Sequence, residues 1–241
     1  MDRIEFAKLR GALARIDAAT SPAEVLDALV NTLRPFGFHH LLITGLPLPQ
    51  QGPWQREIIY DGWPVEWLER YLASGHFAHD PCALRCRISG LPFAWHELSP
   101  GQMTKGQLRV MDEAAEFGLN DGFCIPIHEP RRAPAVVTAA GKRIEFAAGD
   151  VPFLETVCLQ AFRALRRLMA EGSEIDLKLT DREREVLTWI AAGKAAEDVA
   201  CILRISRFTV ERHLSNVREK LDVVNTIQAV VEAMRRGEIH P

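Results

Sequence analysis

The N-terminal part of the chain shows apolar residues at helical spacing, interrupted by residues that begin and end helices. Residues 6–16 place apolar side chains on one helical face and predict a first helix. A second helix is predicted to begin at residues 21–24, where a serine N-cap is followed by a proline and by the glutamate of a capping box. Pro35 and Gly37 are expected to end it.

The middle of the chain alternates short apolar runs, which predict strands, with amphipathic segments, which predict helices. The expected strands are residues 40–46, 57–60, 93–95, 123–128 and 135–140, the expected helices are 65–73, 106–117 and 151–170, and loops are expected at 47–53 and 129–132. Hairpin-like strands with flanking helices predict an α+β domain. We expect an α/β/α sandwich with a mainly antiparallel sheet that encloses a ligand pocket.

A polar, glycine-containing stretch at residues 171–178 precedes a region that is helical throughout. We therefore expect one domain at 1–171, a linker at 172–178 and a four-helix all-α domain at 179–241. The expected helices of the second domain are 182–192, 197–203, 207–221 behind the N-cap Ser206, and 226–236. Two short helices joined by a tight turn are typical of a helix-turn-helix, whose second helix enters the major groove of DNA.

The net charge and its distribution along the chain limit the kinds of partner that the protein can bind. The 241-residue chain carries a net charge of −3, which argues against a protein that coats polyanions without specificity. Residues 201–220 nevertheless hold five basic side chains against two acidic ones. This local excess predicts a surface that faces phosphates, and the alternative is an ordinary solvated helix face.

Composition gives no sign of secretion, membrane insertion or metal binding. No apolar run approaches the roughly 20 residues that cross a bilayer, and the acidic start of the chain does not resemble a signal peptide. The five cysteines are scattered and form no C-x-x-C pair. They are interpreted as buried thiols in a reducing compartment. We expect a cytoplasmic protein with no membrane contact, no metal and no cofactor.

The C-terminal region resembles the LuxR-type DNA-binding domain. The resemblance is carried by residues 179–187 (Leu-Thr-Asp-Arg-Glu-Arg-Glu-Val-Leu) and by Trp189, Ala191, Gly193-Lys194, Ile202-Leu203, Ile205-Ser206, Thr209-Val210, His213, Asn216, Lys220-Leu221, Asn225 and Gln228-Ala229-Val230. It implies a homodimer that binds double-stranded DNA at an inverted-repeat promoter site, with RNA polymerase as a further partner.

The same resemblance implies roles for single residues. Glu183 is expected to hold the recognition helix through a basic or backbone partner, while Leu187 and Trp189 pack in the core. Glu211 departs from the family, whose members usually carry a basic residue there, and if it faces a base its partner is a cytosine amino group. Ser215 and the pair Thr226-Ile227 also depart, so the binding mode is expected to carry over but the DNA sequence is not. The residues expected to contact phosphates or bases are Lys194, Arg207, Thr209, Glu211, Arg212, Ser215, Asn216 and Lys220.

Residues 20–165 resemble the autoinducer-binding domain of quorum-sensing LuxR-type regulators. The resemblance is carried by residues 62–71 (Gly-Trp-Pro-Val-Glu-Trp-Leu-Glu-Arg-Tyr), 79–81 (His-Asp-Pro), 92–95 (Pro-Phe-Ala-Trp), 116–119 (Glu-Phe-Gly-Leu), Gly122 and 124–127 (Cys-Ile-Pro-Ile). It implies an acyl-homoserine lactone as ligand. Such a molecule has an amide N–H, two carbonyls and an apolar tail, and a buried pocket must satisfy its polar atoms.

The residue types fit this ligand. Trp67 and Tyr71 lie four residues apart, hence on one helical face, and both can donate hydrogen bonds. By resemblance, Trp67 binds the lactone carbonyl, Tyr71 the acyl carbonyl and Asp80 the amide N–H, while Trp95 stacks near the lactone ring. Taken singly, a Trp and Tyr at helical spacing are ordinary core residues, and an Asp before Pro is an ordinary cap or turn.

Further residues are expected around the acyl tail. Trp63 stands where a tyrosine is more usual and adds bulk beside the ligand, and Gly122 is a close-packing position. Thr138 is expected to support the acyl carbonyl. The tail pocket, which we expect to favour a short, branched or aromatic acyl group, is expected to be lined by Leu42, Phe123 and Val136.

The predicted function is an acyl-homoserine lactone-responsive transcriptional regulator in quorum sensing, and the alternative is an orphan regulator that senses another cell's signal or a different molecule. Whether the ligand promotes or prevents DNA binding stays open. An enzyme is not expected, because the chain has no G-x-S-x-G, no H-E-x-x-H and no phosphate-binding glycine loop. Residues 151–170 and the last helix are candidates for the dimer interface or for plain core helices.

Overall fold

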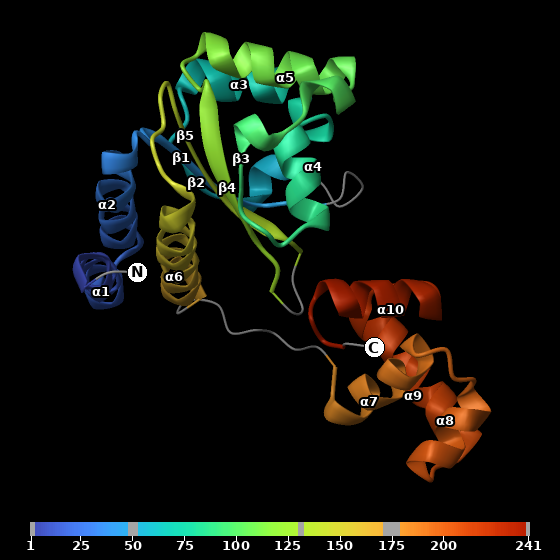
Figure 1. The fold of residues 1–241 in the computed structure, drawn as a ribbon. Coiled ribbons are helices and arrows are strands. Elements are labelled where there is room, and N and C mark those ends of the chain that lie inside the picture. The colour runs from blue at the N-terminus through green and yellow to red at the C-terminus, as the bar shows by residue number, and fades with distance from the viewer. Residues whose placement is uncertain (1–2, 48–52, 130–132, 171–178, 240–241) are drawn as a thin grey trace. The chain divides into compact units, whose positions relative to one another are not determined.

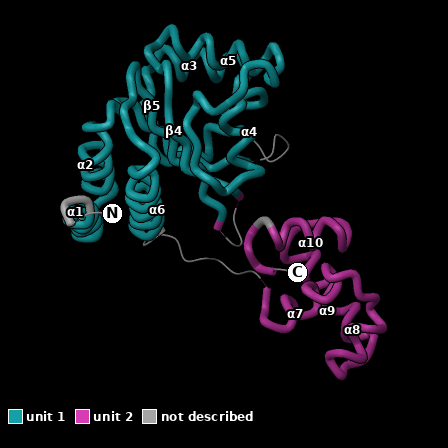
Figure 2. Tube along the Cα trace, in the orientation of Figure 1, with its two compact units in different colours: residues 1–128, 134–173 teal, residues 129–133, 174–241 magenta. Residues whose placement is uncertain are grey.

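The computed structural model describes residues 3–47, 53–129, 133–170 and 179–239. The chain divides into two compact units, residues 1–128 with 134–173 and residues 129–133 with 174–241 (Figure 2). The predicted linker at 172–178 lies outside the described residues, as do most of the loop predicted at 47–53 and of the turn predicted at 129–132.

The first unit is built on an antiparallel sheet of five strands in the order β2-β1-β5-β4-β3. The central pair β4 and β5 is the longest, and Cys124 lies opposite Thr138 in its register. The predicted antiparallel sheet is therefore confirmed. The strands are β1 (His40–Gly45), β2 (Ile58–Asp61), β3 (Phe93–Ala94), β4 (Asp121–Ile127) and β5 (Ala135–Gly141).

Helices cover both faces of this sheet and complete the predicted sandwich (Figure 1). One face carries α1 (Arg3–Ala18), α2 (Pro22–Leu33) and α6 (Val151–Ala170), and the other carries α3 (Val65–Ala73), α4 (Pro81–Ile88) and α5 (Lys105–Glu116). Of these six, only α4 has no counterpart in the sequence prediction. Short 3-10 helices lie at Arg34–Phe36, Trp54–Glu57, His76–Ala78, Trp95–Glu97, Pro100–Gln102 and Ala148–Asp150.

The start of α2 shows how local sequence sets an element boundary. The Ser21 hydroxyl accepts the Glu24 backbone N–H at 3.3 Å, as a serine N-cap should. The Glu24 carboxylate, however, accepts the backbone N–H of Thr20 at 2.7 Å, so the predicted capping box closes one residue earlier than expected. Helix α2 ends at Leu33, and the 3-10 turn Arg34–Phe36 that follows is capped by Gly37, whose φ of 84° is a left-handed conformation that suits glycine.

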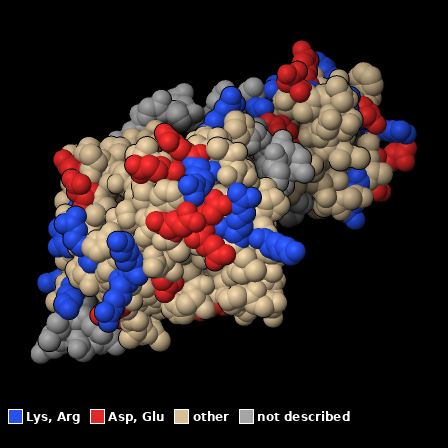
Figure 3. All heavy atoms as spheres, turned by 90° about the horizontal axis from the view of Figure 1, so that it is seen from above, with Lys and Arg blue, Asp and Glu red and all other residues tan. Residues whose placement is uncertain are grey.

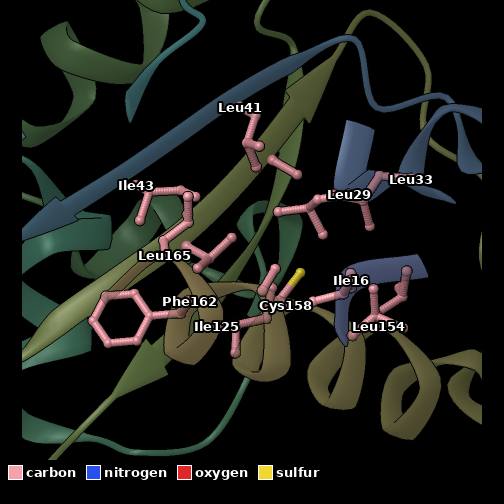
Figure 4. Close-up of a cluster of buried hydrophobic side chains, with 14 of the residues drawn as sticks. Ile16, Leu29, Leu33, Leu41, Ile43, Ile125, Leu154, Cys158, Phe162 and Leu165 are labelled. Carbon is pink, nitrogen blue, oxygen red and sulfur yellow. The ribbon is translucent and has the colours of Figure 1, made fainter. Parts of the chain in front are cut away.

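The face covered by α1, α2 and α6 packs as a continuous apolar core (Figure 4). Leu154, Phe162 and Leu165 of α6 insert between the sheet and α1 and α2. Leu154, Phe162 and Leu165 are therefore core residues of this unit, and a role of α6 in a dimer interface stays a prediction. Strand residues contributed to this face include Leu41, Ile43, Phe123, Ile125, Val137 and Ala139.

The second unit contains the four predicted helices, α7 (Asp181–Ala191), α8 (Ala196–Leu203), α9 (Arg207–Leu221) and α10 (Thr226–Arg235). Their apolar sides meet around Val186, Leu187 and Val210. Ser206 caps α9 by accepting the Thr209 N–H at 3.1 Å, as predicted. Arg204 adopts a left-handed φ of 52° between α8 and α9, which makes the turn of the helix-turn-helix. Among the described helices, none is both long and apolar enough to cross a bilayer.

Candidate functional site

A cavity lies in the first unit between the sheet and helices α3, α4 and α5. Its wall is mostly apolar and aromatic, with a few polar groups, which is the composition of a small-molecule site. The residues that line it are Leu42, Thr44, Leu46, Trp54, Trp63, Trp67, Tyr71, Phe77, Asp80, Cys82, Ala83, Cys86, Trp95, Val110, Met111, Ala114, Cys124, Val136 and Thr138.

The carboxylate of Asp80 is fixed in this wall because it caps α4. Its Oδ1 accepts the backbone N–H groups of Cys82 at 2.7 Å and Ala83 at 3.2 Å, and its Oδ2 accepts the Tyr71 hydroxyl at 2.8 Å. Burial raises the pKa of Asp80, while the hydrogen bonds from Tyr71 and from the α4 backbone oppose that shift. The helix cap and the pocket acceptor are thus the same side chain.

Trp67 and Tyr71 stand side by side on the buried face of α3, with ring centroids 5.6 Å apart. Behind them, His76 packs 5.7 Å from the Trp67 ring and its Nε2 lies 3.1 Å from Glu113 of α5. Hydrogen bonds to Arg109 and His76 hold the pKa of the Glu113 carboxyl below its ordinary value. His76, held by Glu113, thus packs against Trp67 and Tyr71, the two residues of α3 that are predicted to bind the head group of the ligand.

An aromatic wall closes one part of the cavity. Trp54 stacks on Phe77 with centroids 5.1 Å apart and planes at 14°, and it lies 6.3 Å from Trp63. The Arg87 guanidinium also lies over the Phe77 ring, 4.8 Å from its centroid. Sequence reasoning missed Trp54 and Phe77, because neither belongs to the quoted motifs. A tryptophan directly after the predicted 47–53 loop was the only available signal.

The opposite end of the cavity is formed by Trp95 and strands β4 and β5. Trp95 Nε1 donates to Cys124 Sγ at 3.3 Å, and Cys124 Sγ lies 3.3 Å from Thr138 Oγ1. A Cβ added to Gly122 would lie 2.5 Å from the Trp95 ring, so the expected close packing is found here. Of the five cysteines, four are buried as predicted, but Cys201 is exposed.

The structure brings together eight of the nine predicted pocket residues; those that line the cavity are Leu42, Trp63, Trp67, Tyr71, Asp80, Trp95, Val136 and Thr138. The ninth, Phe123, was placed wrongly. Neighbouring residues of a strand face opposite sides of a sheet, so with Cys124 in the cavity Phe123 must face away from it. Its ring packs 4.9 Å from Phe146 in the core under α1, α2 and α6.

The second unit presents α9 as its candidate nucleic-acid surface. Arg212, Ser215 and Glu211 are exposed on this helix, and Thr209 and Asn216 are partly exposed. Lys194 is exposed next to Gly193, which ends α7 at a φ of 81°. These residues lie on α9 and on the turn between α7 and α8, and their contacts with DNA stay predictions.

Ion pairs limit how freely the charges on α9 can act. Arg207 binds Glu197 of α8 at 2.6 Å and lies 3.9 Å from Glu211. Glu211, the departure from the family pattern, therefore has a cationic neighbour on its own helix. This exposed pairing is weak and can be exchanged for a phosphate or a base.

Glu183 anchors α9 to α7. Its carboxylate is buried, accepts the Thr180 N–H at 2.8 Å and binds the Lys220 ammonium at 2.7 Å. Although burial alone would raise it, these bonds from Lys220 and Thr180 hold the pKa of Glu183 below its ordinary value. The basic partner expected for Glu183 is thus Lys220. A phosphate contact by Lys220 has to compete with this carboxylate.

Helix α10 leaves an apolar stripe uncovered within its unit. Ile227, Val231 and Met234 follow one another at helical spacing and are 78%, 59% and 43% exposed. The opposite side of the same helix, with Ala229 and Ala233, is buried. A stripe of this kind marks an interaction surface.

Charge is distributed without a broad patch of one sign on the face seen in Figure 3, where acidic and basic side chains are intermixed. Arg70 of α3 and Glu116 of α5, for example, form an ion pair at 2.9 Å. Within the described residues, no group of three His, Cys, Asp or Glu side chains is arranged to hold a metal ion.

Comparisons with known proteins match both units. Residues 21–165 match the model of the autoinducer binding domain, and residues 177–233 match the model of bacterial regulatory proteins of the luxR family. The transcriptional activator protein BjaR1 of Bradyrhizobium diazoefficiens is 32% identical over 219 residues, 90% of each chain. The quorum sensing-dependent transcriptional regulator RpaR of Rhodopseudomonas palustris is 33% identical over 226 residues, 93% of this chain and 91% of its own.

Solved structures share the fold at lower identity. SdiA in complex with octanoyl-rac-glycerol aligns with a TM-score of 0.77 at 23% identity, covering 100% of this chain and 99% of its own. The N-acylhomoserine lactone dependent factor CepR2 of Burkholderia cenocepacia aligns with a TM-score of 0.54 at 19% identity, covering 70% and 99%. At these identities the likeness concerns the fold alone.

Proposed function

Because this chain belongs to the LuxR family of bacterial regulatory proteins and carries an autoinducer-binding domain, we propose that it is a transcriptional regulator whose DNA binding responds to an acyl-homoserine lactone. The observation that carries the proposal is the cavity in which the Asp80 carboxylate and the Trp67 indole interrupt an apolar wall. This combination suits a ligand with one amide N–H, carbonyl acceptors and an acyl tail.

The head group of the ligand fits the polar part of the cavity. Asp80 Oδ2 accepts one hydrogen bond from Tyr71 and has a lone pair left for the amide N–H of the ligand. The Trp67 N–H is assigned to the lactone carbonyl, and Trp95 flanks the lactone ring. The only O–H of Tyr71 already donates to Asp80, which supports a role for Tyr71 in orienting that carboxylate.

The acyl group is assigned to the region where strands and the aromatic wall meet. Leu42 and Val136 lie on neighbouring strands β1 and β5 and provide its apolar floor. The bulky rings of Trp54, Trp63 and Phe77 limit its length. These contacts support an acyl group that is short, branched or aromatic rather than long and straight.

The second partner is double-stranded DNA, read by α9. Arg212, Ser215 and Asn216 are assigned to base edges or phosphates, with Thr209 and Arg207 at the start of the helix and Lys194 on a phosphate. The Glu183–Lys220 pair holds the helix at its far end. Because the contacts are to phosphates in part, DNA affinity is expected to fall steeply with salt.

A homodimer is the proposed form on DNA. The stripe of Ile227, Val231 and Met234 on α10 is apolar, exposed and repeated at helical spacing, which suits a symmetric helix-to-helix contact. Two copies joined in this way match an inverted-repeat site. The names of the relatives, transcriptional activators, support RNA polymerase as the further partner of the DNA-bound dimer.

Thermal melting of the purified protein tests the proposal. The panel contains homoserine lactones with straight, branched and aromatic acyl groups, and each has its ring-opened acyl-homoserine as a matched control. A ligand at a hundredfold excess over its Kd adds about 2.7 kcal/mol to the free energy of unfolding. We expect some lactones, but not their ring-opened forms, to raise the melting temperature.

A second measurement connects the ligand to DNA. Binding to a fluorescent inverted-repeat duplex is measured with and without the lactone that stabilises the protein. Arg212→Ala is the control, because it should weaken DNA binding while leaving the ligand-induced melting shift unchanged. If no lactone stabilises the well-folded protein, the acyl-homoserine lactone proposal is wrong and the orphan-receptor alternative takes its place.

A further inference from the structure

Two indole donors in the aromatic wall have no partner. The Nε1 atoms of Trp54 and Trp63 are buried and form no hydrogen bond within the described part of the chain. A buried donor without an acceptor costs about 1–3 kcal/mol. Both side chains line the cavity, so an acceptor carried by the bound ligand is the natural way to remove this cost.

Two other donors of the cavity wall already have acceptors. Tyr71 donates to Asp80, and Trp95 donates to Cys124. The proposed function, on which this inference rests, assigns Trp67 to the lactone carbonyl. The acyl amide carbonyl is then the one acceptor of the head group that still lacks a donor, and it can pair with only one of the two unpartnered indoles.

The order of the rings indicates which donor takes that carbonyl. Both indoles lie about equally far from Tyr71, Trp63 at 5.2 Å and Trp54 at 5.1 Å. Trp63 is the one that also contacts Trp67, with ring centroids 6.1 Å apart, whereas Trp54 is stacked on Phe77. The acyl carbonyl therefore falls to Trp63, and Trp54 faces the part of the acyl group that follows.

We propose that Trp54 makes this pocket selective for a compact acyl group that carries an oxygen acceptor of its own beyond the amide carbonyl, such as a ketone or hydroxyl. The stack of Trp54 on Phe77 supports this, because it holds the indole plane and leaves Nε1 little freedom to find another acceptor. An apolar acyl group would leave the Trp54 N–H unpaired in the bound state and would bind more weakly on that ground.

A matched pair of ligands and a matched pair of variants test the proposal. The ligands are N-hexanoyl and N-(3-oxohexanoyl) homoserine lactone, which differ in one ketone oxygen, and affinities are measured by calorimetry. We expect the wild-type protein to bind the oxygenated ligand about tenfold more tightly, the effect of one satisfied buried donor. Trp54→Phe keeps an aromatic ring on Phe77 but removes the donor, so this preference should fall to about one.

Val136→Ala is the control variant. It shortens an apolar side chain of the cavity wall without removing a donor or altering the Trp54–Phe77 stack, so it should weaken both ligands to a similar extent and keep the preference. Binding of both ligands with equal affinity by the wild-type protein, or retention of the preference in Trp54→Phe, overturns this inference but leaves the proposed function intact. Failure of every homoserine lactone to bind overturns both.

Nuclear magnetic resonance of the wild-type protein gives a result that does not depend on a variant. The indole N–H of Trp54 should move downfield when the 3-oxo ligand binds, because it gains a hydrogen bond, and it should not do so with the hexanoyl ligand. Equal downfield shifts with the two ligands contradict a contact between Trp54 and the additional oxygen.

Discussion

The two faces of one sheet have opposite characters. Toward α1, α2 and α6 the strands contribute apolar side chains such as Leu41, Ile43 and Ile125 to a packed core (Figure 4). Toward α3, α4 and α5 the same strands contribute to a cluster that contains a cavity and the polar atoms of Asp80, Thr138 and two unpartnered indoles. Alternation along β4 and β5 produces both faces from adjacent residues.

This difference indicates that one face of the sheet serves the stability of the unit and the other serves ligand binding. A face packed without polar groups stabilises the unit regardless of ligand. A face with a cavity and unpaired donors lacks part of that stabilisation until a ligand fills it. Substitutions on the first face should therefore act on folding, whereas those on the second should act on ligand response.

The largest expected effect is on the packed face. Leu165→Ala removes a side chain that is 1% exposed and should lower the free energy of unfolding by about 2–5 kcal/mol through lost burial and a residual cavity. Urea denaturation measures it. Met169→Ala, on the same helix but 52% exposed, is the control and should change the value by less than about 0.5 kcal/mol. A similar small effect of Leu165→Ala would mean that this face is not the core.

Next in size is a change that fills the cavity face. Gly122→Ala places a Cβ 2.5 Å from the Trp95 ring, so Trp95 must move. Such overpacking costs about 1–3 kcal/mol of folding free energy and displaces the wall beside the proposed lactone ring. The variant should melt at a lower temperature than the wild-type protein without ligand, and ligand should no longer raise its melting temperature. Gly149→Ala, where an added Cβ meets nothing within 4 Å, should alter neither.

Asp80→Asn separates ligand binding from folding. Asparagine caps helices about as well as aspartate, so α4 should persist. The lost charge should reduce ligand affinity about tenfold, since a hydrogen bond to a charged group is worth more than one to a neutral group. Calorimetry measures this, with the exposed Asp112→Asn as control. An unchanged affinity would remove Asp80 from the site.

The smallest expected effect is a dependence on pH. Burial raises the pKa of Asp80 above its ordinary value of 3.8, and an amide N–H of the ligand favours the ionised form. Ligand affinity should thus be constant above the pKa of the free protein and fall as the pH drops through it. Without ligand the sign is opposite, because a raised carboxyl pKa means that stability is lost as the pH rises from 3.8 through the raised value. Asp80→Asn should flatten both profiles, and a persisting slope would assign the effect to another group.

Most of the fold could be predicted from the spacing of apolar residues along the chain. Helices α3 and α6 begin and end at the predicted residues, because each has a clear apolar face and a defined stop. Helix α4 went unnoticed, since Arg85 and Arg87 and small side chains blur its pattern. Its only clear signal was the cap, Asp80 before Pro81, which the sequence left open between a turn and a helix start.

Pocket residues that belong to a sequence motif could be predicted, whereas residues brought to the pocket only by tertiary packing could not. Trp67, Tyr71 and Asp80 came from a linear pattern, but Trp54 and Phe77 meet only through the tertiary fold. Phe123 was misplaced because a strand's facing cannot be assigned until its register with a neighbour is known. The register that pairs Cys124 with Thr138 supplies that information.

The tryptophans provide the most direct test of the division between the two faces and the two units. Four of the five tryptophans, Trp54, Trp63, Trp67 and Trp95, line the cavity, and the fifth, Trp189, lies on α7 of the other unit. We would titrate labelled protein with a homoserine lactone that stabilises it and follow the five indole N–H resonances. We expect the four cavity resonances to shift with one common affinity. If all four stay unchanged while the ligand binds, the ligand lies elsewhere and the proposed binding site is wrong.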